Sequence, residues 1–283
     1  MKLKLIVAAL GLFASASSFA AIATPDTPGG GELYFVVYEQ GAPNGGLDQS
    51  FTLDLGIGIN SFMASKNTFQ NWATLTASTN SVWANFLATS DISSLQFAVL
   101  GAKSTSTSTS SSVASSVFST VTLGNEGNVV PPLTTSSSQN SNSQLSTMIG
   151  GQMTSYQNNV SNTGSHLTQA NGQSVNAIGS GAYFQDTNMA AFNNLLKFTN
   201  NNAVGSAPVE FTQLYRSPVG TGKALEAVMP GKVSFVQSGG DYVLTYGANL
   251  VPTVTPVPEA STYALLLSGL GALGFVARRR KQK

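Results

Sequence analysis

The chain has 283 residues, of which only 9% are charged, with a formal net charge of +1 and no cysteine. The lack of cysteine excludes disulfides, zinc-thiolate sites and cysteine nucleophiles, so the core alone must hold the fold. Residues 24–257 carry 11 acidic residues (12 less Glu259) and 6 basic ones (13 less the seven near the termini), and this net charge of −5 argues against nucleic-acid binding.

The amino-terminal residues 1–23 have the order of a secretory signal peptide. Two lysines precede the apolar run Leu5–Phe13, and small residues follow it. The apolar run is far shorter than the roughly 20 residues that span a bilayer. Small-x-small patterns place the cleavage after Ala20 or after Ala23. The secretion translocon and signal peptidase are the partners that this segment implies.

The exported body, residues 24–251, begins with two expected strands. Leu33–Tyr38 is a continuous apolar and aromatic run, which indicates a strand buried on both faces. Phe51–Ile59 alternates apolar with polar residues and glycine, which predicts a half-buried strand. The residues between them, Ala42–Gly46, favour a turn, so antiparallel pairing of the two strands is expected.

A helical pattern is expected from Ser61 to Leu87, and a strand at Leu95–Leu100. Trp83 shares one helical face with Phe86 and Leu87, behind the capping candidates Thr79, Asn80 and Ser81. Trp72 and Trp83 are the candidates for stacking on sugar rings. The shared apolar face favours core packing over sugar stacking.

Two low-complexity polar stretches, residues 103–116 and 134–143, are expected to be loops, because they cannot bury enough apolar surface. A strand is expected at Val117–Leu123. An amphipathic helix is expected from Leu145 to Val160 and a short helix from Met189 to Leu196. Residues 161–180 are ambiguous, with a weak second helix as one reading.

The body closes on further strands at Val209–Arg216, Val233–Val236 and Tyr242–Tyr246. The last two flank a Ser-Gly-Gly-Asp segment, a strong hairpin signal. The expected fold class is therefore α+β and β-rich. It consists of an antiparallel sheet or sandwich with an inserted helical and Ser/Thr-rich polar segment.

No catalytic residue, cofactor or metal site is predicted. His166 is the only histidine, and its polar surroundings predict an exposed side chain in a flexible region. No ligand spacing for zinc or calcium occurs. Two acids at a suitable separation are enough for a glycosidase, but ordinary surface acids are the expected role of Glu32, Glu39, Asp48, Asp54 and Asp91.

The carboxyl-terminal end has three parts. A proline-rich spacer, residues 252–262, contains Val257, Pro258, Glu259 and Ala260; the apolar segment Tyr263–Ala277 follows, and a basic tail, residues 278–283, ends the chain. The tail contains Arg278, Arg279, Arg280 and Lys281. Such a cluster beside an apolar segment stays on the cytoplasmic side, which indicates a single membrane helix.

This order of features resembles the PEP-CTERM sorting signal. In that family exosortase, a membrane cysteine protease, reads the signal, and its cargo is associated with exopolysaccharide and biofilm production. Ala260 departs from the family, which most often has a second proline there. The resemblance implies an inner-membrane-anchored precursor and a mature form in the cell envelope or outside the cell.

The expected protein is a non-enzymatic component of the envelope or extracellular matrix, with exosortase, the membrane and exopolysaccharide as partners. The alternatives are a carbohydrate-binding or adhesive module and, third, a secreted hydrolase. Exposed coplanar aromatic rings would favour the carbohydrate-binding or adhesive module. Two facing carboxyl groups in a cleft would favour the secreted hydrolase.

Overall fold

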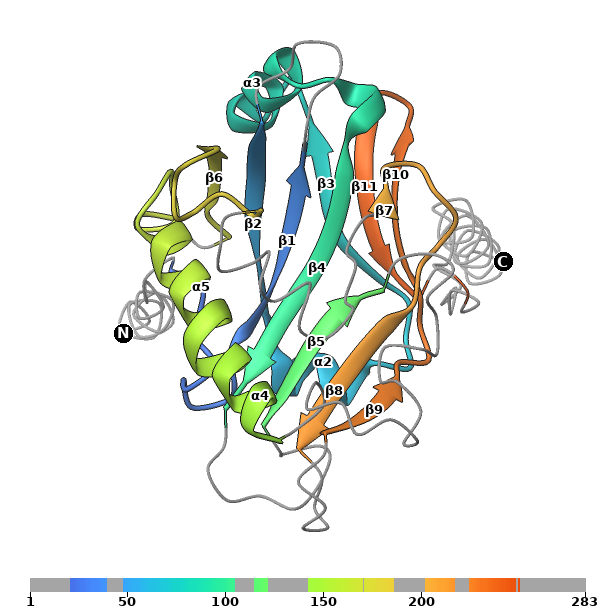
Figure 1. Ribbon diagram of the computed structural model, residues 1–283. Helices are drawn as coiled ribbons and strands as arrows, with labels where there is room; N and C mark the ends of the chain where they lie inside the picture. The colour runs from blue at the N-terminus through green and yellow to red at the C-terminus, as the bar shows by residue number, and fades with distance from the viewer. Residues whose placement is uncertain are drawn as a thin grey trace, which may run out of the picture. The chain divides into compact units, whose positions relative to one another are not determined.

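Two antiparallel sheets make up most of the structure (Figure 1), a computed structural model that describes residues 21–39, 48–104, 115–121, 142–169, 171–185, 202–216, 224–247 and 249. The strands are β1 Glu32–Tyr38, β2 Gln49–Gly58, β3 Gln70–Thr76, β4 Gln96–Lys103, β5 Ser116–Thr120, β6 Gln173–Ala177, β7 Asn202–Ala203, β8 Phe211–Arg216, β9 Ala224–Val228, β10 Val233–Ser238 and β11 Asp241–Tyr246. Within the described residues, the larger sheet has the order β6-β2-β1-β4-β5-β8-β9, with β7 paired to β4, and the smaller has the order β10-β11-β3. The expected β-rich, antiparallel class is confirmed.

Helical segments connect and cover the sheets. They are α2 Ile59–Ser65, α3 Ser81–Thr89, the 3₁₀ turn η1 Ile92–Ser94, α4 Asn142–Thr147, the π-helical segment η3 Met148–Met153 and α5 Thr154–Ser161. The Asn80 side chain accepts a hydrogen bond from the Trp83 backbone N–H at 3.0 Å and caps α3, as the sequence predicts. The expected helix over 145–160 is also confirmed, because α4, η3 and α5 run on without a break.

The larger sheet is covered on both faces, which gives three layers (Figure 1). The segment from α4 to α5 lies in front of it in this view, and β3 and β11 lie behind it. In β1 the side chains alternate between two buried clusters: Tyr34, Val36 and Tyr38 face the helical layer. Leu33, Phe35 and Val37 belong to the cluster shared with the smaller sheet. The prediction that β1 is buried on both faces is confirmed.

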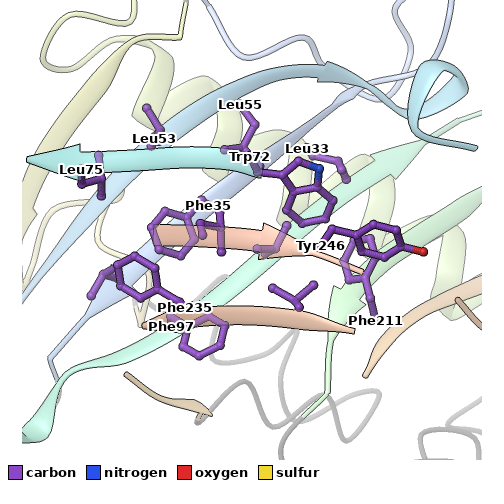
Figure 2. Close-up of a cluster of buried hydrophobic side chains, with 14 of the residues drawn as sticks. Leu33, Phe35, Leu53, Leu55, Trp72, Leu75, Phe97, Phe211, Phe235 and Tyr246 are labelled. Atoms are coloured by element: carbon purple, nitrogen blue, oxygen red, sulfur yellow. The ribbon is translucent and has the colours of Figure 1, made fainter. Parts of the chain in front are cut away.

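Aromatic side chains fill the space between the two sheets (Figure 2). Phe35 of β1 meets Phe235 of β10 edge-to-face, with ring centroids 4.7 Å apart. Trp72 of β3 stacks on Tyr246 of β11, with centroids 5.2 Å apart and an interplanar angle of 12°. This cluster is the apolar core on which the smaller sheet packs.

The hairpin of β10 and β11 confirms its sequence signal. Ser238 pairs with Asp241, so the loop consists of Gly239 and Gly240. Their φ angles are +62° and +94°, the pattern of a type I′ turn. A residue with a Cβ is strained at both positions, which explains the Gly-Gly pair.

Two expectations about local structure are wrong and one open reading is settled, each for a tertiary reason. Residues 70–76 form β3 rather than helix, because they pair with β11. Residues 173–177, which the sequence leaves ambiguous, form β6, because they pair with β2. The strand β2 is buried on both faces along 49–55 rather than half-buried. Thr52 hydrogen-bonds Tyr156 of α5 at 2.9 Å on one face, while Phe51, Leu53 and Leu55 belong to the cluster shared with the smaller sheet on the other.

The loop expected over the polar stretch 103–116 is shorter than predicted. Its two ends belong to strands, since Lys103 pairs with Ser116 in β4 and β5. Residues 105–114 lie outside the described residues, as do most of the stretch 134–143, the turn at 42–46 and the expected helix at 189–196.

The chain divides into two units, Met1–Val251 and Pro252–Lys283. Most of the signal peptide (residues 1–20), the spacer, the apolar segment 263–277 and the basic tail lie outside the described residues. Among the helices that the structure describes, none has the length and apolarity needed to cross a membrane.

Candidate functional site

The strongest cluster of polar chemistry in the described part of the body lies at an irregular point of β2. Leu33 pairs with Ile57 while the next residue, Tyr34, pairs with Asp54, so Leu55 and Gly56 bulge out of the ladder. Gly56 has a φ of +62°, and its N–H donates to Oδ1 of Asp54 at 2.8 Å. The bulge therefore turns the Asp54 carboxyl back onto its own strand.

A turn that follows α5, residues 162–172, docks against this bulge. The Asp54 N–H donates to the Gly172 carbonyl at 3.0 Å. The Ser165 N–H donates to the Gln173 carbonyl at 2.9 Å, and the Gln173 N–H donates to Ser165 Oγ at 2.9 Å. A Cβ on Gly172 would overlap the His166 backbone, so only glycine allows this close packing.

His166 belongs to this turn and is fully buried, which corrects the prediction of an exposed, flexible histidine. The reason is tertiary: the turn folds back on β2, and Gly172 covers the ring. Burial lowers the pKa of His166 to about 4, against a smaller opposite effect of the Thr52 backbone.

Asp54 is the acid at this bulge, and its pKa is strongly shifted. Its side chain is only 3% exposed. Burial raises its pKa to about 7; the hydrogen bond from Gly56 opposes the rise, and the negative charge of Glu32 adds to it. We call the group formed by Thr52, Asp54, Gly56, His166, Asn171 and Gly172 the bulge cluster. A buried acid that titrates near neutral pH can exchange a proton there, and such groups also occur in purely structural settings.

Three of the other candidate acids, Glu32, Glu39 and Asp91, accept hydrogen bonds from backbone N–H groups. Glu39 is buried, and its Oε1 accepts from the Asp91 N–H at 2.9 Å. The Tyr183 hydroxyl donates to the Glu39 carbonyl at 2.8 Å. Burial, and to a smaller extent the negative charges of Asp48 and Glu39, raises the pKa of Tyr183 to about 12. The described residues hold no group of three or more His, Cys, Asp or Glu side chains suited to a metal ion.

The two tryptophans considered for sugar stacking both lie in the core between the sheets. Trp83 is fully buried and Trp72 is 9% exposed. Trp83 packs edge-to-face on Phe51 at 5.0 Å, and Trp72 donates from Nε1 to Gln70 Oε1 at 2.9 Å. In this arrangement neither ring offers a free face to solvent.

Sequence reasoning missed Gly56, Asn171 and Gly172. The Asn-Gly pair is a turn signal, and Asn171 has the positive φ of +56° that this residue type tolerates. Reading this pair as a turn would have separated β6 from the preceding helix. The contact between Asn171 and Gly56 has no local signal, because 115 positions (171 less 56) separate them.

The sorting residues at 257–260 and the basic cluster at 278–281 lie outside the described residues. A comparison with family models matches residues 256–281 to the PEP-CTERM protein-sorting motif. No curated protein and no solved structure matches the chain significantly. The family match therefore covers the carboxyl-terminal end of the chain and none of the body.

Proposed function

Because the chain carries a PEP-CTERM protein-sorting motif at residues 256–281, we propose that it is a non-enzymatic component of the cell envelope or extracellular matrix, associated with exopolysaccharide. The motif marks an exported protein whose membrane-anchored precursor exosortase processes. The motif is the observation that carries the proposal.

The composition of the body supports a matrix role. Only 9% of the chain is charged, and Ser, Thr, Asn, Gln and Gly supply most of its polar surface. Such a surface makes hydrogen bonds with little dependence on salt. The mainly apolar clusters on both faces of the larger sheet give the scaffold a rigid centre.

Replacing Glu259 by alanine, or Arg278, Arg279 and Arg280 together by asparagine, is expected to leave a larger precursor in the membrane fraction. The first change removes the glutamate of the sorting motif, and the second removes the charges that keep the end of the apolar segment on the cytoplasmic side. Immunoblots of the membrane, envelope and exopolysaccharide fractions measure the outcome.

Asp26→Ala, an exposed acid of the body, serves as the matched control and should be processed like the wild type. Normal maturation of both tail variants would contradict the exosortase route. Shortening of exopolysaccharide by the purified mature protein, abolished by Asp54→Asn, would contradict the non-enzymatic role and support a secreted hydrolase instead.

A further inference from the structure

The residues just after the first predicted cleavage site belong to the folded body. Ile22 is 1% exposed and lies in the same buried cluster as Tyr34 and Val36, on the helical side of the larger sheet. Pro25 is also buried. A side chain inside the core cannot be removed without leaving a cavity.

Hydrogen bonds to its backbone groups hold this segment on both sides. The Ala23 N–H donates to Glu32 Oε2 at 2.7 Å, and the Glu32 N–H donates to the Ala23 carbonyl at 3.1 Å. The Ser104 N–H donates to the Pro25 carbonyl at 2.9 Å. The segment is thus tied to the start of β1 and to the residue after β4.

The closeness of this contact depends on Gly31. A Cβ at this position would lie 2.5 Å from the Ala102 carbonyl oxygen and 3.0 Å from the Ala23 carbonyl oxygen. The sequence around β1 therefore has a place built for the backbone of Ala23. The apolar Ile22 and the small Gly31, nine positions apart (31 less 22), serve the same packing.

We propose that signal peptidase cuts between Ala20 and Ala21, and that residues 21–25 then form the first structural segment of the mature protein, with Ile22 in the core. A cut after Ala23 would discard Ile22 and both hydrogen-bonding groups of Ala23. It would also leave the Glu32 N–H without its acceptor. This inference rests on export, which belongs to the proposed function.

In the folded body, Ala23 is held through its N–H and its carbonyl. Small-x-small patterns alone do not rank the two sites, because both satisfy the same requirement. The tertiary structure distinguishes them.

The test is the amino-terminal sequence of the mature protein, produced from the full-length gene in a bacterium with signal peptidase. A start at Ala21 is expected. A start at Thr24 would overturn this inference and leave export intact, whereas a retained Met1 would overturn export itself and this inference with it.

Two substitutions at the cleavage sites sharpen the test. Ala20→Gln removes the small residue of the first site, so cleavage should move to Ala23 and the shortened product should be recovered in several-fold lower amount. Ala23→Gln removes the second site and should leave the start at Ala21. Full recovery of a stable product that begins at Thr24 would overturn the structural role of residues 21–23.

Ile22→Ala tests that role through stability, once the amino-terminal sequence of the variant shows that it still starts at Ala21. The melting temperature of the mature protein is expected to fall by about 5 to 15 °C, as for a buried aliphatic side chain in a domain of this size. Ile178→Ala is the matched control, because Ile178 is 63% exposed, and its melting temperature should stay within about 2 °C. Equal melting temperatures for the two variants would overturn the burial of Ile22.

Discussion

Replacing Phe62 by alanine is expected to lower the free energy of unfolding of the body by about 3 to 5 kcal/mol. Phe62 is fully buried, and its ring lies 5.4 Å from Phe211 and 5.1 Å from Tyr246, measured between centroids. The first ring belongs to the larger sheet and the second to the smaller one. Loss of Phe62 therefore opens a cavity and also removes edge-to-face contacts that join the two sheets.

The urea midpoint of the mature protein, followed by tryptophan fluorescence, measures this effect. Trp72 is a suitable reporter, since its ring lies 5.9 Å from Phe62. Phe69→Ala is the matched control: Phe69 is 38% exposed, and its loss should change stability by no more than about 0.5 kcal/mol. A Phe62→Ala midpoint equal to that of the control would contradict the packing of α2 between the sheets.

Replacing Asp54 by asparagine is expected to stabilise the protein increasingly as the pH rises. Burial raises the pKa of Asp54 from 3.8 to about 7, so between these values the folded state binds more protons than the unfolded state. The contribution of Asp54 to the free energy of unfolding is therefore fully present below pH 3.8 and is lost as the pH rises through 7. The loss amounts to about 4 kcal/mol, which asparagine avoids while it still accepts a hydrogen bond from Gly56.

His166 has the opposite dependence. Its pKa falls from 6.5 to about 4, so between these values the unfolded state binds more protons. Stability is full above pH 6.5 and falls by about 3 kcal/mol as the pH decreases through 4. Between about pH 4 and 6.5 the two groups therefore cancel, and the wild-type stability should change little from their contributions.

Single variants should reveal the pH dependence of stability that each group contributes and that cancels in the wild type. Asp54→Asn leaves only His166, and its urea midpoint should rise from pH 4 to 6.5; His166→Gln leaves only Asp54, and its midpoint should fall over the same range. Both are measured as urea midpoints against pH, with Asp26→Asn, an exposed acid, as the control. Curves parallel to the wild type for both variants would contradict the burial of these groups.

The sequence by itself determined the features that are local. The alternation and apolar runs of β1 and β2 predicted their pairing, and the Gly-Gly pair predicted the β10–β11 hairpin. Asn80 was one of three cap candidates before α3, and the terminal motif identified the sorting signal. Each of these depends on neighbours a few positions apart, so side-chain periodicity and turn chemistry are enough.

Only the tertiary structure decided which polar residues are buried and which strands pair across long separations. Residues 70–76 became β3 because β11 supplies the partner strand, far away in the chain. His166 and Asp54 look like surface residues in sequence, yet the turn at 162–172 and the helical layer remove them from water. Burial also distinguishes the two candidate cleavage sites. The patterns that end at Ala20 and at Ala23 are equivalent as short sequences, whereas the burial of Ile22 beside β1, a property of the assembled fold, favours cleavage after Ala20.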